Sequence, residues 1–179
     1  LNHTLLRIAK ATHLPIMLYN IPGRSVVNLL PESVVELSKV KNIVAIKEAS
    51  GQLEQMAEMI ANTGDDFSLY SGDDSMTLPA LAIGAKGVVS VVSHIAGNEM
   101  KRLITSFFAH RTEQAARLHR DLLPLMKAMF IAPNPTCVKT ALQLRGLDVG
   151  GVRLPLVPLS EAERKTVARQ LKLLDKLSY

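Results

Sequence analysis

Lys47 is the residue whose type and position best suit covalent chemistry. It follows the apolar run 43–46, whose composition predicts a buried strand. Burial disfavours the charged form of a lysine, and the neutral amine is the form that attacks a carbonyl carbon to give a Schiff base. The alternative is a structural lysine paired with Glu48 or a neighbouring carboxylate, which is the commoner situation for an isolated lysine.

Three other residues near the ends of apolar runs suit the same chemistry. Tyr19 ends the run before that of Lys47, where a phenol could shuttle protons or simply cap the core. Arg24 follows a Pro-Gly turn and could grip a carboxylate with two hydrogen bonds, although taken alone it fits a surface arginine. Gly72 would let the backbone approach a ligand closely.

Other reactive residue types fit structural roles better. Asp73 and Asp74 lack a His or Glu partner at metal-ligand spacing, so we expect them to act as a helix N-cap and as support for the site. His94 has no Ser or Cys nucleophile at a recognisable turn, and Cys137 reads as a small buried helix residue. The sequence therefore predicts no metal site.

Alternating patterns predict the elements that position these residues. Four β-rich runs, at 16–19, 43–46, 67–70 and 87–92, alternate with helical patterns that begin near Leu5, Pro31, Leu53 and Thr77. This alternation is typical of βα units with a parallel sheet. Four parallel strands leave two open edges, and a complete eight-stranded barrel needs roughly 250 residues. We therefore expect a chain that begins in the middle of a barrel.

The pattern changes after the fourth run. Residues 98–130 read as a long helix, Pro133-Asn134-Pro135 breaks the chain, a helix covers 138–144, and the last helix begins near Ser160 with Glu163 in the capping-box position. The expected fold is α/β, of the (β/α)8 TIM-barrel type. Its domains are the C-terminal half of the barrel at 1–97 and a helical domain at 98–179.

Composition limits the function classes. The chain has 179 residues, one cysteine and no apolar run near the length of a membrane span, which fits a cytoplasmic protein without disulfides. The net charge of +5 is dispersed along the chain, and aromatic residues make up only 4%. Nucleic-acid binding is therefore disfavoured, because there is no basic patch with stacking aromatics.

Four motifs together resemble the dihydrodipicolinate synthase (4-hydroxy-tetrahydrodipicolinate synthase) family, within the pyruvate-dependent class I aldolases that include N-acetylneuraminate lyase. They are Tyr19-Asn20-Ile21-Pro22-Gly23-Arg24, Ile46-Lys47-Glu48-Ala49-Ser50-Gly51, Ser71-Gly72-Asp73-Asp74 and Pro133-Asn134-Pro135-Thr136-Cys137-Val138-Lys139. Their order and spacing match over essentially the whole chain. Arg24 favours the synthase over the sialic acid lyases, which share the Tyr-Asn-Ile-Pro start.

The resemblance implies a function and a set of roles. Lys47 would form an imine with pyruvate, and the derived enamine would attack L-aspartate 4-semialdehyde to give 4-hydroxy-tetrahydrodipicolinate for lysine and diaminopimelate biosynthesis. Tyr19 would relay protons, Arg24 would hold the carboxylate of the aldehyde, and Val89 would line the pyruvate pocket with backbone. Gly72 would adjoin the substrate. No cofactor is implied, and full-length members form homotetramers.

The resemblance also implies what the chain lacks. Family members carry four further strands before the point that matches Leu1, with a pair of threonines that binds the pyruvate carboxylate and a second tyrosine that reaches the neighbouring subunit. Two alternatives therefore stay open. One is an inactive or self-associating half-barrel, and the other is a different 2-oxo acid aldolase of the superfamily.

Overall fold

The computed structural model describes residues 2–177, which form two compact units that divide between Val89 and Ser90. The sequence-based domain boundary at 97/98 stays a prediction. Unit 1 contains α1 (Asn2–Lys10), β1 (Ile16–Asn20), α2 (Pro22–Ser25), α3 (Pro31–Ser38), β2 (Ile43–Glu48), α4 (Leu53–Asn62), β3 (Ser68–Ser71), the 3-10 turn η1 (Asp74–Met76), α5 (Thr77–Ala82) and β4 (Gly87–Val88).

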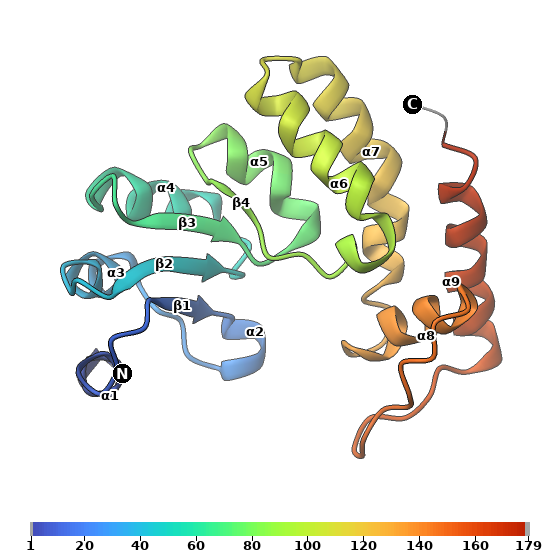
Figure 1. Ribbon diagram of the computed structural model, residues 1–179, viewed down its shortest axis with the longest axis horizontal. Coiled ribbons are helices and arrows are strands. Elements are labelled where there is room, and N and C mark those ends of the chain that lie inside the picture. Colours follow the sequence, from blue (N-terminus) through green and yellow to red (C-terminus); the bar gives the residue numbers. More distant parts are fainter. Residues whose placement is uncertain (1, 178–179) are drawn as a thin grey trace. The chain divides into compact units, whose positions relative to one another are not determined.

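The sheet of unit 1 is parallel, with its strands in the order β1-β2-β3-β4 (Figure 1). The ladder continues one residue past three of the strands. The backbone N–H groups of Ala49, Gly72 and Val89 donate to the carbonyls of Asn20, Glu48 and Ser71 at 2.7–2.8 Å. The residues that follow β2, β3 and β4 are therefore held at the same edge of the sheet. The predicted parallel α/β arrangement is confirmed.

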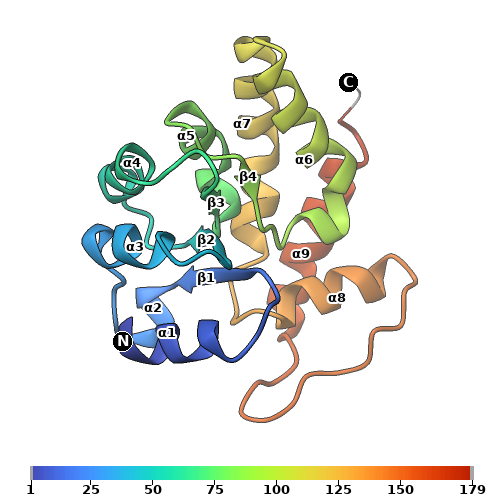
Figure 2. The ribbon, with the colours of Figure 1, turned by 60° about the vertical axis from the view of Figure 1, so that its left-hand side comes forward.

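One face of this sheet packs against helices. Alternation along each strand sends every second side chain to that face, where Leu18, Ile46 and Leu69 are buried. They share a core with residues of the covering helices: Val34, Leu37, Met56, Met59 and Ala80. Figure 2 shows α3, α4 and α5 following one another on one side of the strands. The side chains of Tyr19 and Lys47 alternate with this set, so they point to the opposite face.

The fourth strand is shorter than predicted. The sequence suggested a strand over 87–92, but β4 ends at Val88, and the chain turns at once. The Ser93 N–H donates to the Ser90 hydroxyl, and the His94 N–H donates to the Val91 carbonyl. These turn bonds replace a sheet ladder, so the apolar run Val88-Val89 and Val91-Val92 is only partly strand.

Unit 2 is helical. It contains α6 (Ser93–Phe108), α7 (Thr112–Ala128), α8 (Thr136–Leu144) and α9 (Glu161–Leu174). Helix α7 packs against α6 and α9, and α8 packs against both α6 and α9. The core between them is aliphatic and includes Leu103, Leu118, Leu122, Met126, Val167 and Leu171. Among the described residues no helix is long and apolar enough to span a membrane.

The single long helix predicted for 98–130 is wrong. Two helices occupy this stretch, and the break lies at His110, whose φ of 58° ends α6 in the left-handed region. The Arg111 N–H then reaches back to the Ser106 carbonyl at 2.9 Å, which closes the helix end. Glycine is the usual residue at such a position, so a histidine there gave the sequence no sign of a break.

The predicted capping box at the start of α9 is confirmed. The Ser160 hydroxyl accepts from the Glu163 N–H, and the Glu163 carboxylate accepts from the Ser160 N–H at 2.8 Å. Hydrogen bonds from the side chain and backbone of Ser160 lower the pKa of Glu163 below its usual value. The ionised form of Glu163 is therefore favoured by folding.

Replacing Ser160 with alanine is expected to destabilise the helix by about 1 kcal/mol near pH 7. A carboxyl group whose pKa is lower in the folded than in the unfolded protein stabilises the fold at any pH above its unfolded-state pKa. This stabilisation is lost as the pH falls through the folded-state pKa. The difference in the free energy of unfolding between the variant and the wild type should therefore become smaller below about pH 4. Thermal unfolding of both proteins at pH 7 and at pH 3.5 measures this difference at each pH. Thr166→Ala, which removes an exposed hydroxyl of the same helix, is the control and should not destabilise.

Candidate active site

Lys47 and Tyr19 lie side by side near the C-terminal ends of two paired strands. They are register partners of β2 and β1, and the Lys47 Nζ lies 4.0 Å from the centroid of the Tyr19 ring. Lys47 is the penultimate residue of β2, whereas the sequence suggested that it directly follows the strand, because the strand continues to Glu48. The Tyr19 ring therefore lies beside the lysine amine, and its part as a proton relay stays a prediction.

Tyr70 lies on the other side of Lys47. It is the register partner of Lys47 in β3, so the lysine is flanked by two tyrosines from neighbouring strands. The ring of Tyr70 lies next to Gly87, since a Cβ built at Gly87 would meet its ring atoms at 3.4 and 3.5 Å. The sequence analysis did not single out Tyr70. Its place at the end of the third apolar run was the available signal.

Gly72 provides the space through which the Lys47 side chain passes. A Cβ at Gly72 would lie 2.7 Å from the Ala49 Cβ and 3.1 Å from both the Cγ and the Cε of Lys47. The first of these distances is shorter than real carbon contacts allow. The glycine is thus required for the lysine's path, a steric role beyond the ligand approach suggested by the sequence.

Glu48 does not pair with Lys47. Successive strand residues point to opposite faces, and the fully buried Glu48 carboxylate lies on the helix side of the sheet. It accepts hydrogen bonds from the Ser50 N–H at 2.6 Å, the Asn20 amide at 2.8 Å and the Gln55 amide at 3.3 Å. Among the described residues Lys47 forms no ion pair. The structural alternative for Lys47, pairing with a neighbouring carboxylate, is therefore not realised.

Arg24 lies on α2, the short helix that follows β1. Its side chain is exposed, and within the described part of the chain it forms no ion pair. The turn is stabilised by the Ser25 hydroxyl, which donates to the Ile21 and Val27 carbonyls, and by the Val26 N–H, which donates to the Pro22 carbonyl at 2.9 Å. The φ of 63° at Val26 ends the helix. The guanidinium is thus free to bind an anion from a turn that starts one residue after the strand of Tyr19.

Val89 follows β4 instead of lying within it, which corrects its predicted place in the last strand. Its N–H donates to the Ser71 carbonyl at 2.8 Å, so the residue still lies at the sheet edge beside the loop that holds Gly72. Lys47, Tyr19, Gly72 and Val89 therefore all belong to the C-terminal edge of one sheet. Their roles stay predictions at this point.

The acidic pair and the cysteine have structural surroundings. The Asp73 side chain accepts from the Ser75 N–H at 2.9 Å and caps η1, as predicted, while Asp74 is buried. Cys137 is buried in α8, as predicted, and burial is the main cause that raises the pKa of its thiol. No group of three or more His, Cys, Asp or Glu side chains in the described part of the chain could hold a metal ion.

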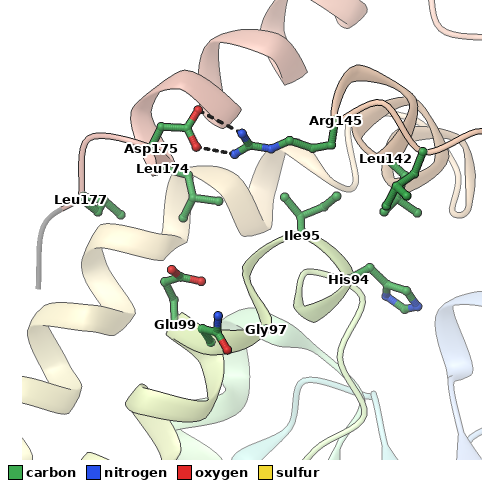
Figure 3. A pocket seen from close by; sticks show the side chains of 11 residues that line it. His94, Ile95, Gly97, Glu99, Leu142, Arg145, Leu174, Asp175 and Leu177 are labelled. Atoms are coloured by element: carbon green, nitrogen blue, oxygen red, sulfur yellow. Dashed lines mark hydrogen bonds and ion pairs between the residues drawn. The ribbon is translucent and has the colours of Figure 1, made fainter.

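A separate cavity lies wholly in unit 2, between α6, α8 and α9, and has a volume of about 420 Å³ (Figure 3). Its main charged feature is the Arg145–Asp175 ion pair, with hydrogen bonds of 2.6 and 3.1 Å. The hydrogen bond from Arg145 lowers the pKa of Asp175 below its usual value. Because the guanidinium is already neutralised and no serine, cysteine or lysine is among the residues that line it, this cavity is not a candidate for the covalent chemistry.

Comparison with known proteins supports the family that the four sequence motifs suggested. A model of the dihydrodipicolinate synthetase family matches residues 1–174. The chain belongs to this family. The family resemblance found in the sequence is therefore confirmed, and the relatives carry the synthase name.

Two curated relatives illustrate the match. The 4-hydroxy-tetrahydrodipicolinate synthase 2 of Halalkalibacterium halodurans is 62% identical over 158 residues, which are 88% of this chain and 54% of that protein. The synthase of Bacillus subtilis is 57% identical over 162 residues, 90% of this chain and 56% of that protein. The chain thus spans a little more than half the length of these relatives.

Solved structures agree on the fold. A dihydrodipicolinate synthase of Bacillus anthracis matches with a TM-score of 0.93 and 50% identity, over 99% of this chain and 60% of that one. A lysine-bound enzyme from Cyanidioschyzon merolae matches with a TM-score of 0.95 and 42% identity, over 98% of this chain and 60% of that one. The predicted fold class, part of a TIM barrel followed by a helical appendage, is therefore confirmed.

Proposed function

We propose that this chain supplies the Schiff-base lysine of a lyase that condenses pyruvate with L-aspartate 4-semialdehyde to give 4-hydroxy-tetrahydrodipicolinate, in lysine and diaminopimelate biosynthesis. The observation that carries the proposal is the placement of Lys47 between Tyr19 and Tyr70 at the C-terminal edge of a parallel sheet, the edge at which barrel enzymes hold their catalytic residues. Membership of the synthase family supports this choice of substrates.

The chemistry needs one amine and a proton relay. The Lys47 nitrogen attacks the keto carbon of pyruvate, and water leaves as the C=N bond forms. Loss of a methyl proton gives an enamine, whose carbon then bonds to the aldehyde carbon of the second substrate. The amino group of that substrate attacks the imine carbon, which closes the ring and releases Lys47. The protonated imine accepts the electron pair when the methyl proton leaves. When the two carbons bond, the enamine returns that pair and the aldehyde oxygen accepts it together with a proton, so the reaction needs no cofactor.

The other residues have distinct parts in this proposal. The Tyr19 phenol donates a proton to the departing water and relays protons during enamine formation. Arg24 binds the carboxylate of the aldehyde with two hydrogen bonds. The backbone at Val89 lines the pyruvate pocket, and Gly72 leaves room for the lysine and its adduct. A cytoplasmic location and a homo-oligomeric assembly belong to the same proposal.

Pyruvate consumption in the presence of L-aspartate 4-semialdehyde tests the proposal. Consumption should require the aldehyde and should disappear in Lys47→Arg, which keeps the charge but not the nucleophilic amine. Lys86→Arg, an exposed lysine between α5 and β4, is the matched control and should behave as the wild type. Consumption that survives in Lys47→Arg would contradict the proposed role.

A half-barrel that associates without turnover is the second candidate. Among the described residues β1 and β4 each pair with one strand only, and Met17 and Tyr19 are exposed on the face away from the helices. Open edges of this kind favour association with another chain. A folded chain that consumes no pyruvate and elutes as an oligomer in size-exclusion chromatography with light scattering would favour this candidate over the first.

A further inference from the structure

A cluster of four polar side chains lies on the helix side of the sheet, beneath the candidate site. Asn20, Glu48 and Gln55 are buried and Asn28 is half-buried. The Asn20 amide donates to both the Glu48 carboxylate and the Asn28 side-chain oxygen at 2.8 Å. The Gln55 and Asn28 amides are also joined, with the Asn28 amide donating at 2.8 Å. Each member therefore has partners within the cluster, as buried polar groups require.

The cluster closes the loop that carries Arg24. Asn20 is the last residue of β1, and its side-chain oxygen accepts from the Leu29 N–H at 2.9 Å, while its amide donates to Asn28. One asparagine side chain thus joins the two ends of the segment 21–29. The apolar residues at its tip add little packing, since Val26 is 91% and Val27 54% exposed, whereas Leu29, where the segment ends, is buried in the core. The loop between these ends is therefore held by hydrogen bonds, those of Asn20 and Asn28 together with those of the Ser25 hydroxyl.

The same cluster is attached to the strand residues that follow the catalytic candidates. Asn20 comes directly after Tyr19, Glu48 directly after Lys47, and Asn20 and Glu48 are register partners. The hydrogen bonds that close the Arg24 loop therefore end on the two strands that carry the tyrosine and the lysine. A displacement at Asn28 would move the guanidinium relative to the lysine amine without touching either strand.

We propose that Asn28 is a positioning residue for Arg24: by binding Asn20, it holds the loop at the distance from Lys47 that a short substrate carboxylate requires. The inference rests on the proposed function for its consequence in catalysis. Its structural part, that Asn28 orders the loop, stands independently of activity.

Trypsin measures the structural part. Its cleavage of the Arg24–Ser25 bond reports the order of the loop, and cleavage after Arg153, in an exposed segment of unit 2, serves as the internal reference. Asn28→Leu, which keeps the branching of the side chain and removes its three hydrogen bonds with Asn20 and Gln55, should accelerate cleavage after Arg24 relative to the reference by about tenfold or more, as the loss of one net hydrogen bond already implies. Should this variant fail to fold, Asn28→Ser, which leaves room for water, takes its place.

Asn42→Leu is the matched control. Asn42 is another half-buried asparagine of unit 1, directly before β2, and its amide donates to the Ala9 and Thr12 carbonyls at 2.9 and 3.1 Å, near the opposite end of β1. This variant should lose comparable stability and leave cleavage after Arg24 unchanged. Equal acceleration in both variants, or none in Asn28→Leu, would overturn the proposal.

Kinetics test the catalytic consequence. In Asn28→Leu the KM for the aldehyde should rise about tenfold, while the rate at which Lys47 is trapped with pyruvate and borohydride stays unchanged. A parallel loss of pyruvate trapping would show a general structural role and would contradict positioning of Arg24. If the wild type traps no pyruvate, the proposed function fails, and the trypsin comparison still decides whether Asn28 orders the loop.

Discussion

Replacing Gly72 with alanine is expected to reduce trapping of pyruvate on Lys47 by about a hundredfold, the scale of loss for a reacting group displaced by about 1 Å. The added Cβ would lie 2.7 Å from the Ala49 Cβ and 3.1 Å from two carbons of the lysine side chain. Both contacts are relieved only if the lysine or its neighbour moves. Borohydride trapping with quantified adduct measures the loss, and far-UV circular dichroism checks that the variant is folded.

Two companion variants make the Gly72 result specific. Gly23→Ala adds the same methyl group in unit 1, where nothing lies within 4 Å, and should trap pyruvate as the wild type does. Combining Gly72→Ala with Ala49→Gly removes the 2.7 Å contact and leaves those with Lys47, so trapping should recover only in part. Full activity of the single Gly72→Ala variant would show that the path of Lys47 is not constrained by this loop.

Replacing Tyr19 with phenylalanine is expected to slow imine formation by about 10²- to 10⁴-fold, the usual range for losing a general acid–base group. The substitution keeps the ring that lies 4.0 Å from the Lys47 Nζ and removes only the phenol oxygen. Tyr19→Ala also removes the ring, whose contact with a cation is worth about 0.5–1 kcal/mol at an exposed site. Loss of the ring should therefore change the rate of imine formation by a further factor of only about two to five. Stopped-flow measurement of imine formation compares the variants.

Tyr70→Phe is the control for the Tyr19 prediction. Tyr70 flanks the same lysine in register from β3, and its ring lies next to Gly87. Loss of its hydroxyl should change the rate of imine formation little. A rate lost equally in both phenylalanine variants would assign the proton relay to the pair of tyrosines, and a loss confined to Tyr70→Phe would contradict the role given to Tyr19.

The order of the elements was predictable because local signals and packing agreed. The β-rich runs that became β1, β2 and β3 are buried on one face against helices, so their apolar character was strong. Pro31 and Ser160 marked helix starts by capping chemistry. Where an element depended on backbone conformation without a signature residue, as at His110, the sequence contained no usable sign.

The candidate site was predictable in part for the same reason. Strand alternation placed Lys47 and Tyr19 on one face, and parallel pairing brought them together. The steric role of Gly72 was not predictable, because it depends on the path of the Lys47 side chain across a neighbouring loop. The polar cluster around Asn28 and Glu48 was not predictable either, since hydrogen bonds between residues 20, 28, 48 and 55 form only when the strands and helices are packed together.

The most direct test of the central claim is to incubate the protein with pyruvate and borohydride and to map the adduct by peptide mass spectrometry. The proposed chemistry predicts one reduced pyruvate adduct, on Lys47, that is absent in Lys47→Ala and unchanged in Lys86→Arg. An adduct spread evenly over exposed lysines, or no adduct on Lys47 in the folded protein, would contradict the assignment of this lysine as the Schiff-base amine.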